Sequence, residues 1–360
     1  MTILPLIFSS SSIPQASLFI SITSSSLLHI LPYLSINSII IITTTTNTTM
    51  PFHPTKDIPD LTGKTILITG ANSGLGKTSV LEFSRHNPSQ IWLAARNLTK
   101  AQSAADEIKQ QVPTARIHLL ELDLSSFASI QKAVEVFLST ATRLDILMLN
   151  AGVMAAPPGM TPDGRYEVQF GTNYMGHALL TRLLLPIMEK TAKRDDAGVG
   201  GRVRIVAVAS HGQRYAPPGG LQFETFKTNG ESMGPFARYG QSKLALVLWV
   251  RMLAQLYPWL TAASIDPGVV GTTLGDGATG APRYIQFLFK VALVLRLAAS
   301  LENGVRNQLW AAVSREVNSG EYYDPVGVVG KSALGRDEEL ARRLWVWTEG
   351  ELDNYLGVRD

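Results

Sequence analysis

A tyrosine and a lysine stand four positions apart in the segment Tyr239-Gly-Gln-Ser-Lys243, directly before the apolar residues 244–250. Residues four apart on a helix lie one turn above each other, so a phenol and an ammonium can meet at one point. A nearby cation lowers the pKa of a phenol from its free value of about 10, toward the range in which it exchanges a proton with a carbonyl oxygen. Alone, the pair also fits an ordinary surface helix, because this spacing often arises by chance.

A glycine-rich segment earlier in the chain favours the chemical interpretation. It reads Thr69-Gly-Ala-Asn-Ser-Gly-Leu-Gly76 and lies between a β-branched run and a helical pattern. Glycines at such a turn let the backbone approach a pyrophosphate, while the start of the helix offers free N–H groups and a favourable dipole. We therefore expect a dinucleotide site, with a generic glycine-rich turn as the alternative. The residues expected at this site are Thr69, Gly70, Asn72, Ser73, Gly74, Leu75 and Gly76.

The end of the second strand pattern predicts which dinucleotide binds. NAD usually requires an acidic residue about 20 positions beyond the glycines, to bind the ribose hydroxyl. Residues 90–105 contain no Asp or Glu, and Arg96 stands in that place. A guanidinium suits a 2′-phosphate, so the sequence favours NADP(H), with a solvated loop charge as the alternative for Arg96. Lys77, in the first helical turn, would either add to the phosphate field or be a surface lysine.

Short β-branched runs alternate with longer helical patterns from Lys64 onward. The strand patterns cover residues 65–69, 90–95, 116–122, 144–150, 202–209, 261–266 and 321–323, and the helical patterns cover residues 75–86, 99–111, 126–140, 166–191 and 235–256. Such alternation is typical of strands joined by right-handed crossovers into a parallel sheet. We predict one α/β domain with a doubly wound, Rossmann-type parallel sheet of about seven strands and helices on both faces.

Two further segments at strand ends are expected to meet the cofactor in this fold. Asp123 and Leu124 follow the third strand and are placed for an adenine edge. Asn150, Ala151 and Gly152 end the fourth strand, where a glycine lets the cofactor approach.

Three loops are longer than ordinary crossover turns, at residues 192–201, 217–220 and 271–283. Long loops beyond strand ends often cover a site. The strongly apolar residues 285–299 follow the third loop. They would either pack in the core or against a partner, or close over a hydrophobic substrate.

Composition excludes some classes of function. Lys and Arg number 32 against 29 Asp and Glu, without a basic tract, so nucleic acid is not indicated as a partner. The chain has no cysteine, which excludes disulfides and thiolate metal sites and agrees with a reducing compartment. We expect a cytoplasmic protein and no metal site.

The first 55 residues differ from the rest of the chain, because they are rich in Ser, Thr, Ile and Leu and contain no Asp, Glu, Lys or Arg. They lack the basic start of a secretory signal, and prolines and serines interrupt their apolar runs. We expect a low-complexity, disordered leader, with Met50 as the natural start of the functional chain. The alternative is membrane association through residues 1–55, with an anchor at residues 27–42.

Four motifs follow one another in the order typical of the short-chain dehydrogenase/reductase family: Thr-Gly-x-x-x-Gly-x-Gly, Asn150-Ala-Gly152, Tyr-x-x-x-Lys and Asp266-Pro-Gly268. The chain resembles that family over residues 60–356. Within it, Asn173-Tyr-Met-Gly-His177, Gly271-Thr-Thr273 and residues 320–327 are similar to the retinol-dehydrogenase-like branch. Residues 144–154 are also similar to fungal members, many of which tailor secondary metabolites.

The resemblance implies a catalytic tetrad of Asn173, Ser210, Tyr239 and Lys243. Tyr239 would be the acid in reduction and the base in oxidation, and Ser210 would bind the substrate oxygen. Lys243 would bind the nicotinamide ribose and favour the phenolate, while Asn173 would hold a water that passes protons to solvent. The resemblance also implies cofactor contacts at Tyr239, Lys243, Pro267, Gly268, Val270 and Thr272.

The sequence departs from the family pattern around Ser210. Ser210 precedes Tyr239 by 29 positions, more than in compact members of the family. The inserted residues 213–235 leave the shape of the substrate pocket open. His211 is interpreted as a loop histidine rather than a second acid/base.

Together these features predict an NADP(H)-dependent oxidoreductase that interconverts a ketone or aldehyde and an alcohol on an apolar small molecule. The alternative is a catalytically silent NADP(H)-binding sensor or scaffold, which would bind the cofactor without consuming it. A homodimer built on the helices at residues 166–191 and 235–256 is what the family suggests.

Overall fold

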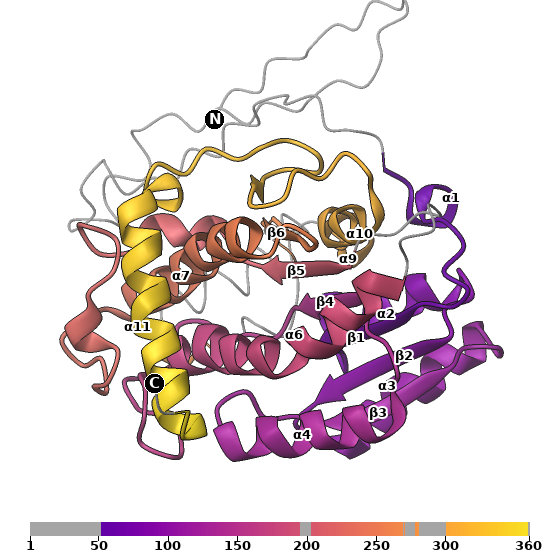
Figure 1. Ribbon diagram of the computed structural model, residues 1–360, viewed down its shortest axis with the longest axis horizontal. Helices are drawn as coiled ribbons and strands as arrows, with labels where there is room; N and C mark the ends of the chain where they lie inside the picture. The colour runs from indigo at the N-terminus through magenta and orange to yellow at the C-terminus, as the bar shows by residue number, and fades with distance from the viewer. Residues whose placement is uncertain (1–51, 195–202, 269, 271–277, 281–299, 359–360) are drawn as a thin grey trace, which may run out of the picture. The chain divides into compact units, whose positions relative to one another are not determined.

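Seven parallel strands form one sheet in the order β3-β2-β1-β4-β5-β6-β7 in this computed structural model (Figure 1). The structure describes residues 52–194, 203–268, 270, 278–280 and 300–358. The strands are β1 Thr65–Thr69, β2 Gln90–Ala95, β3 Ile117–Glu121, β4 Ile146–Leu149, β5 Arg204–Val208, β6 Thr261–Ile265 and β7 Tyr322–Tyr323. The predicted fold class is confirmed.

The middle of the sheet is buried on both faces. Every residue of β1, β4, β5 and β6 is buried, and Ile68 of β1 lies between Leu93 of β2 and Met148 of β4. A parallel sheet covered on both sides requires nearly continuous apolar strands, which is the pattern in the sequence. The predicted limits of β1 and β2 are confirmed, and the other strands are somewhat shorter than predicted.

Helices cover both faces of the sheet (Figure 1). One apolar cluster unites α2, α3 and α10 with the sheet and includes Phe52 and Ile58, which flank α1, and a second cluster unites the sheet with α4, α6, α7 and α11. The helices are α1 Pro54–Asp57, α2 Gly74–Ser84, α3 Leu98–Gln111, α4 Phe127–Thr140, α5 Val168–Phe170, α6 Gly176–Arg194, α7 Pro235–Leu256, α9 Leu301–Gly304, α10 Arg306–Val313 and α11 Glu338–Leu356. Short turns of 3₁₀ helix are η3 His211–Tyr215, η4 Phe223–Thr225 and η6 Leu334–Arg336.

The helix predicted at residues 166–191 is not one continuous α-helix. It consists of α5, a five-residue π turn η2 at Gly171–Met175, and α6. The π turn carries Asn173, whose side chain binds the backbone of Val153 in the segment after β4. Single π turns inside helices are frequent at functional sites. The helix is therefore interrupted at a residue that the sequence places in the tetrad.

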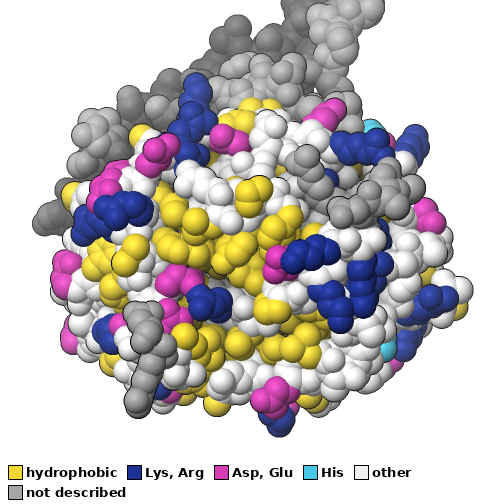
Figure 2. Space-filling model, viewed as in Figure 1, with side chains coloured by type: hydrophobic (Ala, Val, Ile, Leu, Met, Phe, Trp, Pro, Cys, Tyr) yellow, Lys and Arg dark blue, Asp and Glu magenta, His cyan; other side chains and the backbone are white. Residues whose placement is uncertain are grey.

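Helix α11, the yellow helix in Figure 1, runs across α7, α6 and α4. Its Thr348 hydroxyl lies 2.7 Å from the Tyr174 hydroxyl of η2, and its Asp353 accepts a hydrogen bond from Arg182 of α6 at 3.0 Å. The inserted segment also packs here, with the ring of Phe226 centred 4.9 Å from that of Trp347. In the same view, apolar side chains gather on the surface over α6 and α7 (Figure 2).

The chain from Thr48 to Asp360 forms one compact unit. Several expectations lie outside the described residues: those for the leader up to residue 51, for most of the loops at residues 192–201 and 271–283, for Thr272, and for residues 285–299. Among the helices that the structure describes, none is long and apolar enough to cross a membrane.

Candidate active site

The glycine turn connects the carboxyl end of β1 to the start of α2. Gly70 and Gly74 have φ angles of +64° and +52°, which side chains rarely tolerate. A Cβ atom on Gly76 would lie 2.5 Å from the backbone oxygen of Gly70, so the turn closes tightly on itself. The first N–H groups of a helix have no partner within it, so α2 directs unpaired donors toward this turn from Ser73 onward. The backbone therefore suits a pyrophosphate, as expected.

Thr69 ties this turn to the end of β4. Its hydroxyl oxygen accepts the backbone N–H groups of Asn150 and Ala151, at 2.9 and 3.0 Å. The Asn150 side chain in turn donates to the Thr69 carbonyl at 2.8 Å. These bonds bring Gly152 to the edge of the same site. A Cβ atom on Gly152 would lie 3.2 Å from Asn173 Oδ1 and 3.4 Å from Lys243 Nζ, so the glycine lets both side chains lie close to the backbone at this point.

The charged residues expected at the nucleotide differ in their exposure and in the side chains that bind them within the protein. Arg96 is exposed directly after β2. Lys77, in contrast, forms an ion pair at the surface with Glu107 of α3. Asp123 accepts two hydrogen bonds from Ser125 at one carboxylate oxygen. Arg96 is thus the expected phosphate ligand whose side chain faces solvent.

Leu124 and Val270 reach the site only as packing residues in this structure. Leu124 is buried, and its carbonyl lies where a Cβ atom on Gly176 would stand. Val270 packs against Gly304, where Leu75 of the glycine turn also lies.

Asp266 holds two loops at the carboxyl end of β6. One of its carboxylate oxygens accepts the N–H of His211 at 3.0 Å, and the other accepts the N–H of Gly268 at 2.9 Å. Gly268 has a φ of +77° and an open space where a Cβ atom would stand, next to Pro267. Burial and the neighbouring Asp324 raise the pKa of the Asp266 carboxyl. Asp266 belongs to a motif that is visible in the sequence, but the motif alone indicated no role for it.

Tyr239, Ser210 and Lys243 meet at the carboxyl ends of β5 and β6. Ser210 lies two residues beyond the end of β5, and its side chain is within hydrogen-bonding reach of the Tyr239 phenol. Lys243, one helical turn beyond Tyr239, is almost completely buried, and its ammonium donates to the Val208 carbonyl at 2.7 Å. Lys243 Nζ lies 5.8 Å from the centre of the Tyr239 ring. The structure therefore brings these three expected residues together.

The pKa of Tyr239 differs from the expectation. We expected Lys243 to lower it, but burial raises the pKa of Tyr239 to about 12, against a smaller lowering by the hydrogen bond with Ser210. Burial also lowers the pKa of Lys243 to about 8. Burial favours the neutral form of both a phenol and an ammonium. Here burial outweighs the electrostatic effect of each side chain on the pKa of the other. At pH 7 Tyr239 is thus a protonated phenol.

Asn173 joins the tetrad through its amide, which has no exposed surface. Its Oδ1 accepts the N–H of Val153 at 2.7 Å, and its Nδ2 donates to the Val153 carbonyl and to Ser242 Oγ, both at 2.9 Å. The side chain is therefore fully used in holding the segment after β4 against α7. Any water held by Asn173 would have to bind its backbone carbonyl instead.

His211 is half-exposed and begins the 3₁₀ turn η3, where the sequence indicated a loop. Its Nδ1 is 3.3 Å from the Asp324 carboxylate, so it pairs with an acid rather than pointing to the Tyr239 phenol.

An ion pair next to Tyr239 fixes the surrounding elements. Arg238 and Glu167 are each about 1% exposed, and their charged groups lie 2.8 Å apart. Arg238 also donates to the carbonyls of Ala156 and Pro157, at 2.8 and 3.2 Å. The Glu167 carboxylate accepts the N–H of Phe170 and thereby caps the start of α5. The pair therefore fixes the loop after β4, the helix before Asn173 and the helix of Tyr239 relative to one another.

We expect Glu167→Gln to lower the free energy of unfolding by about 3–5 kcal/mol, because it leaves the Arg238 charge buried without its partner. Urea unfolding followed by circular dichroism measures the change. The control is Glu339→Gln, which removes an exposed ion pair with Arg342 and should change little. Equal effects of the two substitutions would contradict the importance of the buried pair.

Several residues in this arrangement had no role in the sequence analysis. Val153 and Val208 contribute backbone groups, which no sequence pattern reveals. Ser242 stands between Tyr239 and Lys243, but only its contact with Asn173 shows its importance.

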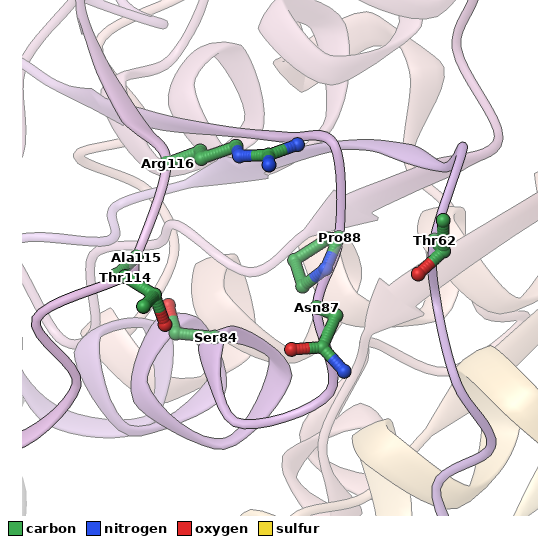
Figure 3. A pocket seen from close by; sticks show the side chains of 7 residues that line it. All are labelled: Thr62, Ser84, Asn87, Pro88, Thr114, Ala115 and Arg116. Atoms are coloured by element: carbon green, nitrogen blue, oxygen red, sulfur yellow. The ribbon is translucent and has the colours of Figure 1, made fainter.

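A separate pocket of about 110 Å³ lies at the amino-terminal ends of the strands, opposite the site described above (Figure 3). Thr62, Pro88 and Arg116, which precede β1, β2 and β3, line it with Ser84 and Asn87. Open α/β sheets bind ligands at the carboxyl ends of their strands. This pocket is therefore not the site of the chemistry.

Comparison with known proteins agrees with the geometry. Residues 64–280 match the family described as short chain dehydrogenase. The chain belongs to the short-chain dehydrogenase/reductase family. The relative drtF of Aspergillus calidoustus, a short-chain dehydrogenase/reductase, is 36% identical over 309 residues, which are 82% of this chain and 95% of the relative. Retinol dehydrogenase 13 of Homo sapiens is 34% identical over 292 residues, which are 79% of this chain and 82% of the relative. The resemblance to the retinol-dehydrogenase-like branch is thus confirmed.

Solved structures of the family share the fold. An uncharacterised protein of Mycobacterium paratuberculosis has a TM-score of 0.61 at 27% identity and covers 84% of this chain and 98% of its own. A short chain dehydrogenase of Shigella flexneri, solved in complex with NADP, has a TM-score of 0.54 at 20% identity and covers 74% and 98%. At that identity the second likeness shows the fold alone. As a family member, the chain is an oxidoreductase that acts on CH–OH groups with a nicotinamide cofactor.

Proposed function

We propose that this oxidoreductase uses NADP(H) to interconvert a ketone or aldehyde and an alcohol on an apolar substrate. The observation that carries the proposal is the convergence of Ser210, Tyr239 and Lys243 beside the glycine-lined edge of the sheet. We place the catalytic domain at residues 60–356 and treat residues 1–55 as a separate leader.

In the direction of reduction, Tyr239 would donate its phenolic proton to the carbonyl oxygen. Its pKa of about 12 keeps the proton in place at pH 7, which suits an acid better than a base. Ser210, itself in reach of the phenol, would hold the same oxygen. Lys243, whose ammonium lies close to the backbone of Gly152, would bind the nicotinamide ribose. When bound, the cofactor supplies the hydride chemistry at its nicotinamide ring.

The apolar substrate is proposed from the residues next to the tetrad. Met154 and Phe236 pack with the buried Ala155 and Ala278 in one small apolar cluster. The ring of Tyr215, half-exposed on η3, is centred 6.3 Å from that of Phe236. Ligand pockets lined mainly by apolar and aromatic side chains take apolar ligands. A role in tailoring secondary metabolites rests on the similarity to fungal relatives alone.

The choice of NADP(H) is proposed from Arg96, and its reversal is testable. We expect Arg96→Asp to lower the preference for NADPH over NADH by roughly 10- to 100-fold, because a charge-assisted bond to the 2′-phosphate is lost and a repulsive charge is added. Fluorescence titration with each reduced cofactor measures the ratio of dissociation constants. The control is Arg116→Asp, because Arg116 lies before β3, at the amino-terminal ends of the strands. An unchanged ratio in Arg96→Asp would show that another residue binds the phosphate.

The activity itself is tested by mixing the purified chain with NADPH and a panel of apolar ketones and aldehydes. Loss of the reduced-nicotinamide absorbance with formation of an equal amount of alcohol supports the proposal. Tight binding of NADPH without consumption across the panel would favour a sensor or scaffold instead.

A further inference from the structure

His177, in the first turn of α6, has no exposed surface and forms two hydrogen bonds inside the protein. Its Nδ1 lies 2.9 Å from the backbone oxygen of Asn173. Its Nε2 lies 2.9 Å from the hydroxyl oxygen of Thr69, the last residue of β1. One side chain thus joins the strand that ends in the glycine turn to the π turn that carries Asn173.

The partners of Thr69 determine which ring nitrogen of His177 carries the proton. The Thr69 hydroxyl oxygen already accepts the N–H groups of Asn150 and Ala151. Its own hydrogen is left to donate, and His177 Nε2 is much nearer than the Met148 carbonyl at 3.5 Å. The ring proton of His177 therefore lies on Nδ1.

The neutral ring then donates from Nδ1 to the Asn173 carbonyl. Burial lowers the pKa of His177 to about 3, and the ammonium of Lys243 acts in the same direction. The imidazole is thus uncharged at pH 7 and offers one donor and one acceptor, each of which has a partner.

The hydrogen bonds continue from Asn173 to the catalytic helix. Asn173 Nδ2 donates to Ser242 Oγ at 2.9 Å, and Ser242 Oγ donates to the Tyr239 carbonyl at 2.7 Å. Asn173, His177 and Ser242 have no exposed surface. A continuous buried chain therefore runs from Thr69 through His177, Asn173 and Ser242 to the backbone of Tyr239. Fully satisfied polar networks of this kind hold their members in one arrangement.

We infer that His177 is a positioning residue, which holds the Asn173 carbonyl in the π turn and joins the cofactor turn to the helix of Tyr239 and Lys243. The inference rests on the proposed function for its effect on turnover. The hydrogen bonds and the tautomer are independent of that function.

Two substitutions separate the two bonds of His177. The Nδ2 of an asparagine can replace Nδ1, so His177→Asn keeps the bond to Asn173 and loses the one to Thr69. The Oε1 of a glutamine can replace Nε2, so His177→Gln keeps the bond to Thr69 and loses the one to Asn173. We expect His177→Asn to weaken NADPH binding roughly tenfold, and His177→Gln to lower kcat at saturating NADPH roughly 10- to 100-fold, because each leaves a buried group unpaired.

Controls and a second measurement keep the test decisive. Thr181→Val changes a buried hydroxyl one turn further along α6 and should alter neither quantity. Ser242→Ala breaks the same chain of hydrogen bonds at its other end and should lower kcat, as His177→Gln does. It therefore tests the chain even if the glutamine variant does not fold. Nitrogen-15 spectroscopy of the wild-type protein should show a neutral His177 with its proton on Nδ1 at pH 7.

The outcomes distinguish this inference from the proposed function. A proton on Nε2, a charged ring, or losses in the two His177 variants that merely follow their melting temperatures would overturn the positioning role. Absence of turnover with every carbonyl, together with the expected tautomer and the expected weakening of NADPH binding in His177→Asn, would sink the proposed function and leave the inference standing.

Discussion

Tyr239→Phe is expected to lower kcat by about 10²- to 10⁴-fold, the usual contribution of a positioned proton donor, while NADPH still binds. The substitution removes only the phenolic oxygen. The aromatic ring remains, and it is the ring that packs against Gly212, where a Cβ atom would lie 2.7 Å from Tyr239 Cε1. Without the hydroxyl, Ser210 can still hold the carbonyl oxygen but no side chain delivers a proton. Steady-state kinetics and fluorescence titration of NADPH measure the two effects separately.

Tyr322→Phe is the matched control for this substitution. Tyr322 is another buried tyrosine, on β7, and packs against Ala209 and Val247 near the same edge of the sheet. It should lose little activity. If Tyr239→Phe kept full turnover, or lost NADPH binding together with turnover, Tyr239 would not be the proton donor.

Lys243→Met should have opposite effects on catalysis and on stability. Turnover should fall by about 100-fold or more, because the proposed ribose ligand and the buried charge beside the Tyr239 ring are lost together. The cofactor-free protein should become more stable at pH 7. The pKa of Lys243 is about 8 in the folded protein instead of 10.5, so its burial costs about 3 kcal/mol while it is charged. Loss of its bond to the Val208 carbonyl offsets about 1 kcal/mol of that gain.

The stability difference between Lys243→Met and the wild-type protein should depend on pH, because the pKa of Lys243 is lowered in the folded state. Below pH 8 the lysine is charged in both the folded and the unfolded state, and the stability advantage of Lys243→Met is complete. Between pH 8 and 10.5 the unfolded state binds more protons at this residue, so its contribution makes the wild-type protein more stable as the pH rises. The advantage of the variant should therefore shrink across this window. Urea unfolding at several pH values measures it, with the exposed Lys132→Met as control. A constant difference would contradict a lowered pKa of Lys243.

The sequence predicted the sheet well because its central strands are apolar on both faces. The run at β1 is bounded by Lys64 and by the glycine turn, so both of its ends were visible. At β4 the prediction began two residues too early, at Leu144, whose N–H binds the Thr191 side chain of α6 instead of a neighbouring strand. The next residue, Asp145, forms backbone hydrogen bonds with Thr65 and Arg204, and its buried carboxylate is held by tertiary partners. It pairs with Lys64 and Arg143 and accepts the N–H of Thr65. Ion pairs between distant segments leave no periodic pattern in the sequence.

The site was predicted in its residue types but not in its interactions. The spacing of Tyr239 and Lys243 indicated their meeting, yet the pKa of the phenol depends on how deeply the fold buries it. Lys77 was interpreted either as a phosphate ligand or as a surface lysine, and its ion pair with Glu107, 30 positions away on another helix, was not predicted. The side chain of Asn173 likewise binds Val153, which only the folded chain brings close. Each of these outcomes follows from tertiary contacts that local sequence does not contain.

The most direct test of the account is a crystal structure of the protein with NADP⁺ and an alcohol that it oxidises. We predict that the alcohol oxygen lies within about 3.2 Å of both Tyr239 Oη and Ser210 Oγ, with its carbon about 3–3.5 Å from the reactive carbon of the nicotinamide. A nicotinamide ring bound at this edge of the sheet, but with the Tyr239 phenol beyond hydrogen-bonding reach of the substrate oxygen, would contradict the proposed chemistry.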